Sequence, residues 1–264
     1  MNESADQPRN TRYFYLLIFL ILSICAASAI AQSKVESPYY ARVNTFGVFS
    51  AYSGDSSHIL MGSAENRRLL DFGVSYSRKL ILGRVVNWQY NGELLPVALE
   101  SDPYSHIVEN LTSPNVVTYT YDAMPLVSCA TVTEPFTYIV TNPDGSTTTH
   151  SGTTTNSCSD RRRWTIGEGI SPIGFQWNFL PRNKLQPFFI GHGGYMYSTQ
   201  PIPIQEAGSF NFTFDFGPGF ELYRSKTKSV RVEYRYHHIS NHGTATANPG
   251  IDNGLFQVTY AFGR

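Results

Sequence analysis

Three residues near the C-terminus have the types that a serine esterase needs. His238 and Ser240 are two positions apart, and Asp252 follows twelve residues after the serine. In an extended strand, side chains at i and i+2 point to the same side, with Cα atoms about 7 Å apart. A histidine so placed can accept the proton of a serine hydroxyl, and a carboxylate can orient the histidine. This chemistry requires that the flanking segments be neighbouring strands.

The segment before Ser240 alternates as a strand with one apolar side does. Its even positions are apolar and its odd positions polar: Val230, Val232, Tyr234 and Tyr236 against Arg231, Glu233, Arg235 and His237. Continuing the even parity puts His238 and Ser240 on the apolar side, and Asp252 shares the outward parity of Phe256 and Tyr260. We therefore expect all three reactive side chains on the outer side of a sheet.

The same alternation recurs along the chain and predicts eight strands. They are expected near residues 45–53, 68–80, 84–98, 165–180, 186–199, 207–222, 229–240 and 254–263. An even number of antiparallel strands can close without edges, as a membrane requires. The connections after the second, fourth and sixth strands are short, whereas those after the first, third and seventh are long. This pattern is typical of the periplasmic and extracellular ends of barrels, so the predicted fold is an all-β, eight-stranded antiparallel transmembrane β-barrel.

Composition favours the same class. Only 15% of the 264 residues are charged, against about 25% in ordinary soluble domains. Phe and Tyr number 17 each, and the net charge of zero gives no general argument for nucleic-acid binding. One long apolar stretch is too few for a polytopic helical membrane protein. An aromatic, weakly charged chain of this kind is typical of the outer membrane.

The long apolar stretch, residues 13–31, has the features of a secretory signal. Arg9 and Arg12 precede it, and it ends in Ala29-Ile30-Ala31. We expect a signal peptide over residues 1–31 and a mature barrel over residues 32–264.

The mature chain keeps two cysteines, Cys129 and Cys158, which we expect to form a disulfide in an oxidising compartment. They lie in an insert of about residues 101–163, on the extracellular side. A turn signal at residues 142–145 predicts a hairpin that the disulfide would staple at its base.

The reactive segment resembles a known family, the outer-membrane lipid A 3-O-deacylases. The resemblance rests on His238-Ile239-Ser240-Asn241 followed by Asn248-Pro249-Gly250-Ile251-Asp252, and it is absent from the insert. It implies an eight-stranded barrel of the outer membrane that hydrolyses the ester at position 3 of lipid A. No metal or other cofactor is expected, and the expected partner is the lipopolysaccharide of the outer leaflet.

The resemblance also implies a role for each site residue. Ser240 would be the nucleophile, His238 the general base and Asp252 the acid that orients it. Asn241 and the amide of Gly243 would form the oxyanion hole. The chain departs from the family pattern twice, because Asp252 replaces the usual glutamate and His242 replaces a small residue.

Other interpretations are weaker. An outer-membrane phospholipase also carries His-x-Ser on a lipid-facing strand, but that family uses Asn as its third member, calcium and more strands. A non-enzymatic adhesive barrel would use the stapled insert for binding. The spacing of His238 and His242 suits zinc on a helix, whereas this segment is expected to be strand and loop. Arg161-Arg162-Arg163 is expected to be a solvated cluster that could meet lipid A phosphates.

Overall fold

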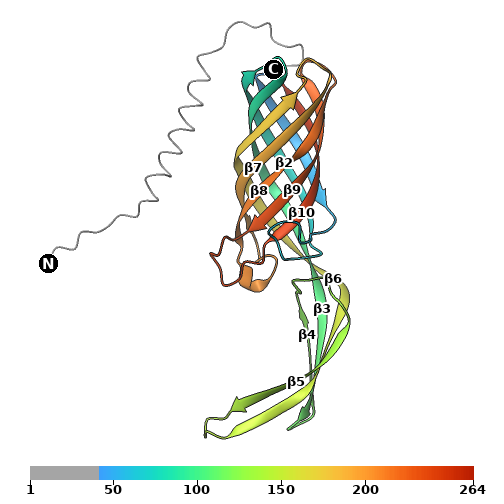
Figure 1. Cartoon of the computed structure of the whole chain (residues 1–264), viewed down its shortest axis with the longest axis vertical. Coiled ribbons are helices and arrows are strands. Elements are labelled where there is room, and N and C mark those ends of the chain that lie inside the picture. The colour runs from blue at the N-terminus through green and yellow to red at the C-terminus, as the bar shows by residue number, and fades with distance from the viewer. Residues whose placement is uncertain (1–41) are drawn as a thin grey trace, which may run out of the picture.

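The computed structural model describes residues 42–264 (Figure 1). The predicted signal peptide, residues 1–31, lies outside these residues. The described chain consists of strands apart from one 3-10 turn, η1 (Gln205–Ala207), and its connecting loops. Within residues 42–264, no helix is long and apolar enough to cross a membrane.

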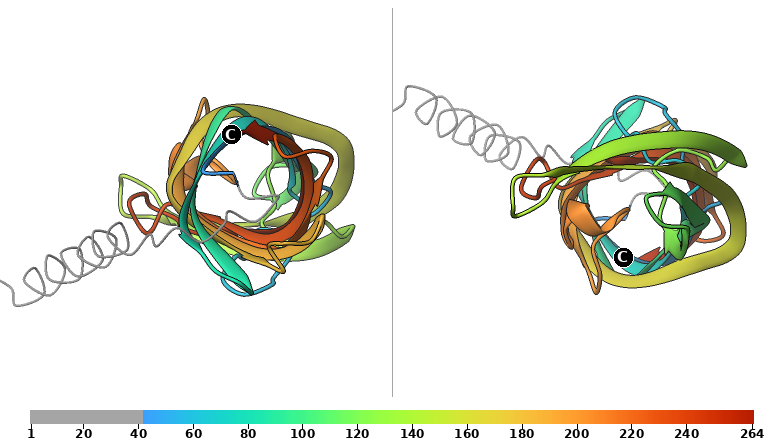
Figure 2. Two further views of the ribbon diagram at one scale, coloured as in Figure 1. Left: turned by 90° about the horizontal axis from the view of Figure 1, so that it is seen from above. Right: turned by 90° about the horizontal axis from the view of Figure 1, so that it is seen from below.

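Eight strands form a closed barrel, which Figure 2 shows end-on as a ring. They are β1 (Asn44–Ser53), β2 (Arg68–Leu82), β3 (Val86–Ser113), β6 (Thr147–Phe179), β7 (Leu185–Ser198), β8 (Phe210–Tyr223), β9 (Lys228–Ser240) and β10 (Ile251–Gly263). Each pairs antiparallel with its neighbours, and the β3–β6 and β1–β10 ladders complete the ring. The predicted all-β, eight-stranded antiparallel barrel is therefore confirmed.

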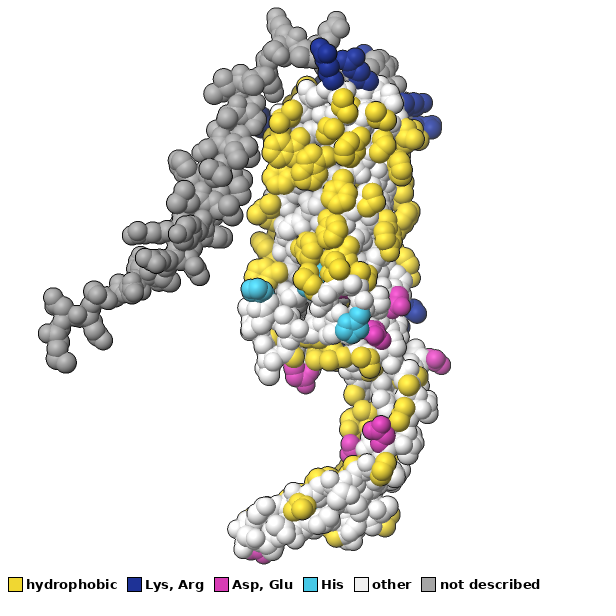
Figure 3. All heavy atoms as spheres, in the orientation of Figure 1, with side chains coloured by type: hydrophobic (Ala, Val, Ile, Leu, Met, Phe, Trp, Pro, Cys, Tyr) yellow, Lys and Arg dark blue, Asp and Glu magenta, His cyan; other side chains and the backbone are white. Residues whose placement is uncertain are grey.

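The alternation of apolar and polar residues along each strand explains why the outer wall of the barrel is apolar. In β9, Val232 and Tyr234 are 38% and 58% exposed, whereas Arg231, Glu233 and Arg235 are buried inside. Apolar side chains cover the visible outer wall of the barrel in Figure 3. This belt is the surface that faces the hydrocarbon of a membrane.

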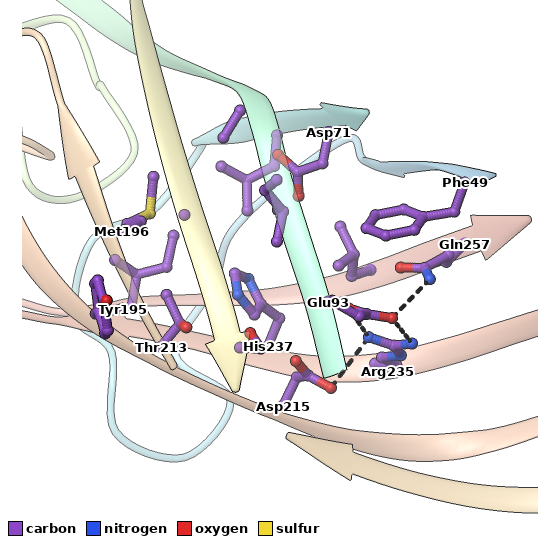
Figure 4. Close-up of a pocket in the computed structure, with 17 residues that line it drawn as sticks. Phe49, Asp71, Glu93, Tyr195, Met196, Thr213, Asp215, Arg235, His237 and Gln257 are labelled. Carbon is purple, nitrogen blue, oxygen red and sulfur yellow. Dashed lines mark hydrogen bonds and ion pairs between the residues drawn. The ribbon is translucent and has the colours of Figure 1, made fainter. Parts of the chain in front are cut away.

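Polar side chains fill the barrel interior. Arg235 reaches Glu93 at 2.8 Å and Asp215 at 3.3 Å, and Gln257 donates to Glu93 at 3.2 Å (Figure 4). The cavity beside them measures about 30 Å³, which is room for one or two water molecules. A hydrogen-bonded network therefore packs this part of the interior, and the cavity there is too small for an acyl chain.

The two ends of the barrel differ, as the loop lengths predict. Turns at residues 83–85, 180–184 and 224–227 lie at the end that also carries the C-terminus (Figure 1). The long β1–β2 and β9–β10 loops and the insert lie at the opposite end. By the usual asymmetry of such barrels, the long-loop end is extracellular.

The insert is a larger sheet than the stapled hairpin that we expect from the sequence. Strands β3 and β6 continue beyond the barrel, and their ladder runs on from Ser105↔Cys158 to Ser113↔Ser151. Two added strands, β4 (Val117–Ala123) and β5 (Val132–Thr141), pair with β3 and β6 respectively. The expected strand ends near residues 98 and 165 are therefore wrong. The described chain has ten strands, of which eight close the barrel.

The predicted disulfide is present in this insert. Cys129 and Cys158 are bonded, with Cα atoms 5.4 Å apart. Strand β5 and the start of β6 form the predicted hairpin, with its turn at residues 142–146. The disulfide closes the base of that hairpin, beside the point where the insert meets the barrel.

Candidate active site

The β9–β10 ladder brings two of the three predicted residues into contact. Asp252 is the cross-strand partner of His238. Its Oδ1 lies 2.6 Å from His238 Nδ1, which is the distance of a strong, charge-assisted hydrogen bond. Directly opposed outward residues are the closest side-chain neighbours on one face of an antiparallel sheet. The contact leaves Nε2 as the ring nitrogen available to a substrate or nucleophile.

The Asp252 carboxylate is fully buried, and three further donors surround it. The Tyr236 hydroxyl donates to Oδ1 at 2.8 Å. The backbone amides of Leu60 and Met61, in the β1–β2 loop, donate to Oδ2 at 2.7 and 2.8 Å. Such donors stabilise the ionised carboxylate and fix its orientation. Asp252 is therefore held as an anion that points at His238.

Ser240 lies on the same outward face, two residues after His238, and is half-buried. Its hydroxyl donates to Asn248 Oδ1 at 3.2 Å and accepts from the amide of His242 at 3.1 Å. Within residues 42–264, no hydrogen bond joins Ser240 to His238. Catalytic hydrogen bonds often form only in the substrate complex, and a rotation of the serine side chain would release its hydroxyl from Asn248.

The two predicted oxyanion donors are engaged with each other and with the loop. The Gly243 amide donates to Asn241 Oδ1 at 2.8 Å. The side-chain NH₂ of Asn241 donates to the carbonyls of Ala207 and Ala247. In this conformation Asn241 fastens the β9–β10 loop, and neither donor points into open space.

Both departures from the family pattern fit this geometry. The shorter Asp252 still reaches His238 because the two residues are directly opposed. The side chain of His242 is exposed and its ring meets Phe212 edge-on, with centroids 6.2 Å apart.

The motif glycine, Gly250, has φ +63°, and a Cβ there would lie 3.0 Å from the His238 ring. A side chain at that position would press on the imidazole.

Aromatic side chains of β8 flank the reactive face. Phe214 is the cross-strand partner of His238, and Phe212 is that of Ser240. The Phe214 and His238 ring centroids are 6.2 Å apart, and Phe212 is 44% exposed. An acyl chain approaching Ser240 from the hydrocarbon would therefore meet an apolar wall.

A second cluster of ionisable groups lies inside the barrel. Glu93, His192 and Asp215 approach one another closely enough to hold a metal ion. Arg235 already lies among them, 2.8 Å from Glu93 and 3.3 Å from Asp215. Its positive charge neutralises the carboxylates, so the cluster is satisfied as an ion-pair network. It does not open onto the outward face that carries His238.

The sequence suggested that the arginine cluster of the insert is solvated, but only Arg161 is exposed. Arg161 is exposed and pairs with Asp122 at 2.9 Å. Arg163 pairs with the fully buried Asp102, and Arg162 donates to Ser101 and to the Asn66 carbonyl. Arg162 and Arg163 join the insert to neighbouring loops, because Arg162 donates to the Asn66 carbonyl and Arg163 donates to the Pro201 carbonyl.

Sequence reasoning missed the contacts that hold the reactive residues. Leu60 and Met61 act through backbone amides, which have no sequence signature. The Asn248 side chain belongs to the recognised motif, but its contact with Ser240 depends on how the loop folds back. The contact of the Tyr236 hydroxyl could have been predicted, since Tyr236 lies two residues before His238 on the same outward side of the strand.

One family model matches the part of the chain that contains the reactive motif. The model of the family described as lipid A 3-O-deacylase (PagL) matches residues 134–261. A search of curated proteins finds no match. Among solved structures, the outer membrane enzyme PagL has 12% identity and a TM-score of 0.46, covering 83% of this chain and 99% of that chain. Neisserial surface protein A has 9% identity and a TM-score of 0.38, covering 84% and 97%.

The family match spans the part of the chain that contains β6 to β10, and so includes every predicted catalytic residue. Over residues 134–261, this β-barrel is therefore similar to the lipid A 3-O-deacylase (PagL) family.

Proposed function

We propose that this protein is an outer-membrane serine esterase that removes the 3-O-linked acyl chain of lipid A. The observation that carries the proposal is the His238–Asp252 pair, on the lipid-facing side of the extracellular rim, with Ser240 two residues further along the same face. The family match supports lipid A as the substrate class.

In the proposed reaction, Ser240 Oγ attacks the carbonyl carbon of the ester, and His238 Nε2 takes the hydroxyl proton. Asp252 holds the imidazole in the tautomer that carries its proton on Nδ1 and stabilises the imidazolium that forms. Collapse of the tetrahedral intermediate breaks the ester C–O bond, and His238 returns the proton to the departing sugar oxygen. An acyl-serine remains.

Water completes the cycle. His238 removes a proton from a water molecule that attacks the acyl-serine, and the hydroxy fatty acid leaves while Ser240 regains its proton. The oxyanion would be stabilised by Asn241 and the amide of Gly243. For this, the Gly243 amide must leave Asn241 Oδ1, and the Asn241 NH₂ must leave the carbonyls of Ala207 and Ala247, when the substrate binds.

The decisive experiment weighs lipid A from a lipopolysaccharide-producing host that expresses the wild type or Ser240→Ala. We expect the wild type to release one ester-linked hydroxyacyl chain and Ser240→Ala to release none. Ser225→Ala, in the turn at the opposite end of the barrel, is the matched control and should act as the wild type does.

Two outcomes would overturn the proposal. Identical acyl-chain counts with the wild type and with Ser240→Ala would remove the esterase assignment. Release of fatty acid from phospholipids, with lipid A unchanged and a requirement for calcium, would instead favour the phospholipase alternative.

A further inference from the structure

We infer that residues 56–67, in the β1–β2 loop, are a positioning element for Asp252 and that the base of the insert locks this loop in place. The inference rests on the proposed function, because it explains how the acid of that site is held. It also gives the insert, which lies outside the reactive motif, a role in the reaction.

The tip of the loop makes the contact with the acid. Leu60 and Met61 direct successive amides at one carboxylate oxygen of Asp252, at 2.7 and 2.8 Å. The next residue, Gly62, packs so closely that a Cβ would lie 2.6 Å from the Asp252 amide nitrogen and 2.9 Å from its carboxyl carbon. Glycine is therefore needed at this position for the two amides to reach the carboxylate.

The loop also runs along the backbone around Asp252. The Ser57 amide donates to the Asp252 carbonyl at 3.1 Å, and the Ser63 amide donates to the Pro249 carbonyl at 2.7 Å. Short bridges join Ser56 to Asn253 and Ala64 to Ile251. The loop thus holds the start of β10 on both sides of the acid. A shift of the loop would move the acid with it.

The far end of the loop is fastened to the insert by buried charge. Arg67 is fully buried and pairs with Asp102 at 3.2 Å. It also donates to the carbonyls of Pro125 and Leu126, at 2.6 and 3.0 Å, in the segment that joins β4 to β5. Arg163, at the other side of Asp102, pairs with it at 2.5 Å. One carboxylate therefore joins the loop to both long strands of the insert.

A second contact fastens the same loop beside the disulfide. Glu65 Oε2 accepts a hydrogen bond of 2.7 Å from the amide of Ser128, the residue before Cys129. The Glu65 amide donates to the Leu126 carbonyl at 2.7 Å. Because the disulfide ties Cys129 to β6, these two contacts give the loop a covalently fixed support.

The first test changes the tip of the loop. Gly62→Ala forces the loop away from Asp252 without altering any charge. Displacing a catalytic group by about 1 Å can cost about 100-fold in rate, so we expect kcat to fall by at least about tenfold while KM stays within about twofold. Gly54→Ala is the matched control, since a Cβ there meets only the Tyr52 ring at 3.4 Å or more. It should keep the wild-type kcat.

The second test changes the support at a distance. Asp102→Asn keeps the side-chain size and leaves Arg67 and Arg163 without their anion, so we expect the same fall in kcat with little change in KM. The matched control is Asp122→Asn, an acid of the insert that pairs with Arg161 and His106 and touches neither the loop nor Asp102. It should leave kcat unchanged. Folding of every variant is checked by heat-dependent migration of the barrel on gels.

The outcomes separate this inference from the proposed function. If the wild type deacylates lipid A and folded Gly62→Ala and Asp102→Asn keep the wild-type kcat, the loop does not position the acid and the inference is wrong. If the wild type leaves lipid A intact, the proposed function fails. The loop is then tested by the NMR signal of the His238 Nδ1 proton, which must shift in Gly62→Ala and not in Gly54→Ala for the inference to hold.

Discussion

Asp252 and His238 face each other directly across the β9–β10 ladder, and the 2.6 Å contact between them uses an aspartate where the family usually has glutamate. The buried carboxylate fits its surroundings closely, because the amides of Leu60 and Met61 and the Tyr236 hydroxyl reach it from the other sides. The length of the aspartate side chain therefore fits the space between these donors and the imidazole.

This match predicts that restoring the family residue lowers activity. In Asp252→Glu the extra methylene would displace either the β1–β2 loop or the imidazole, and overpacking of this kind costs about 1–3 kcal/mol. We expect kcat for lipid A deacylation to fall by about tenfold. A variant as fast as the wild type would show that the enclosure adapts to the longer acid.

Removing the charge of Asp252 should have a larger effect. Asp252→Asn keeps the shape but cannot fix the imidazole tautomer or stabilise the imidazolium, so we expect kcat to fall by about 100-fold to 10,000-fold. Steady-state kinetics with purified lipid A provide the measurement. Asp55→Asn, at an exposed position in the β1–β2 loop, is the control that should retain activity.

Tyr236 should contribute through its hydroxyl. Tyr236→Phe removes one hydrogen bond to the Asp252 carboxylate, worth about 1.5–3 kcal/mol because the acceptor is charged, and should lower kcat by about tenfold to 100-fold. Tyr234→Phe changes the neighbouring outward tyrosine of β9, which is 58% exposed, and should not affect kcat. Equal rates for the two variants would contradict a role for the Tyr236 hydroxyl in holding the acid.

Phe212 should affect substrate binding more than chemistry. It lies opposite Ser240 and is 44% exposed to the hydrocarbon, so Phe212→Ala should raise KM for lipid A several-fold with a smaller change in kcat. Phe262, 42% exposed near the opposite end of the barrel, provides the matched control. A rise in KM with Phe262→Ala as large as with Phe212→Ala would indicate a general membrane effect.

Acid should loosen the contact between the β1–β2 loop and the insert. The hydrogen bond from the Ser128 amide lowers the pKa of Glu65. A lowered pKa in the folded state means that the contact stabilises the fold fully above the unfolded pKa and is lost as pH falls through the folded value. Limited proteolysis of residues 124–131 should therefore accelerate at acid pH in the wild type. In Glu65→Gln the cleavage rate should no longer rise as the pH falls.

Much of the barrel follows from the sequence because each of its strands has a lipid side and a filled interior. The alternation of Val232 and Tyr234 with Arg231 and Glu233 reports both environments at once, and it places His238 and Ser240 on the correct face. The parity of Asp252 was predictable for the same reason. The start of β10 at Ile251, three residues earlier than expected, extends that parity as far as the acid.

Beyond its stapled hairpin, the sheet of the insert could not be predicted in this way. Strands β4 and β5 are exposed on both faces, and the threonine-rich start of β6, from Thr147 onward, carries no alternation of apolar and polar residues. The contacts of Leu60 and Met61 with Asp252 were also out of reach. They join backbone groups to a side chain 192 and 191 positions away, and only the closure of the barrel brings these segments together.

The β5–β6 hairpin ends in a tight turn, where the Gly145 amide donates to the Asn142 carbonyl and Gly145 has φ +82°. This turn lies at the far end of the insert, well away from the barrel (Figure 1). An epitope tag placed in it would project from the cell surface without touching the reactive face. Antibody labelling of intact cells could then count correctly inserted molecules of each variant, so that activity is expressed per folded barrel.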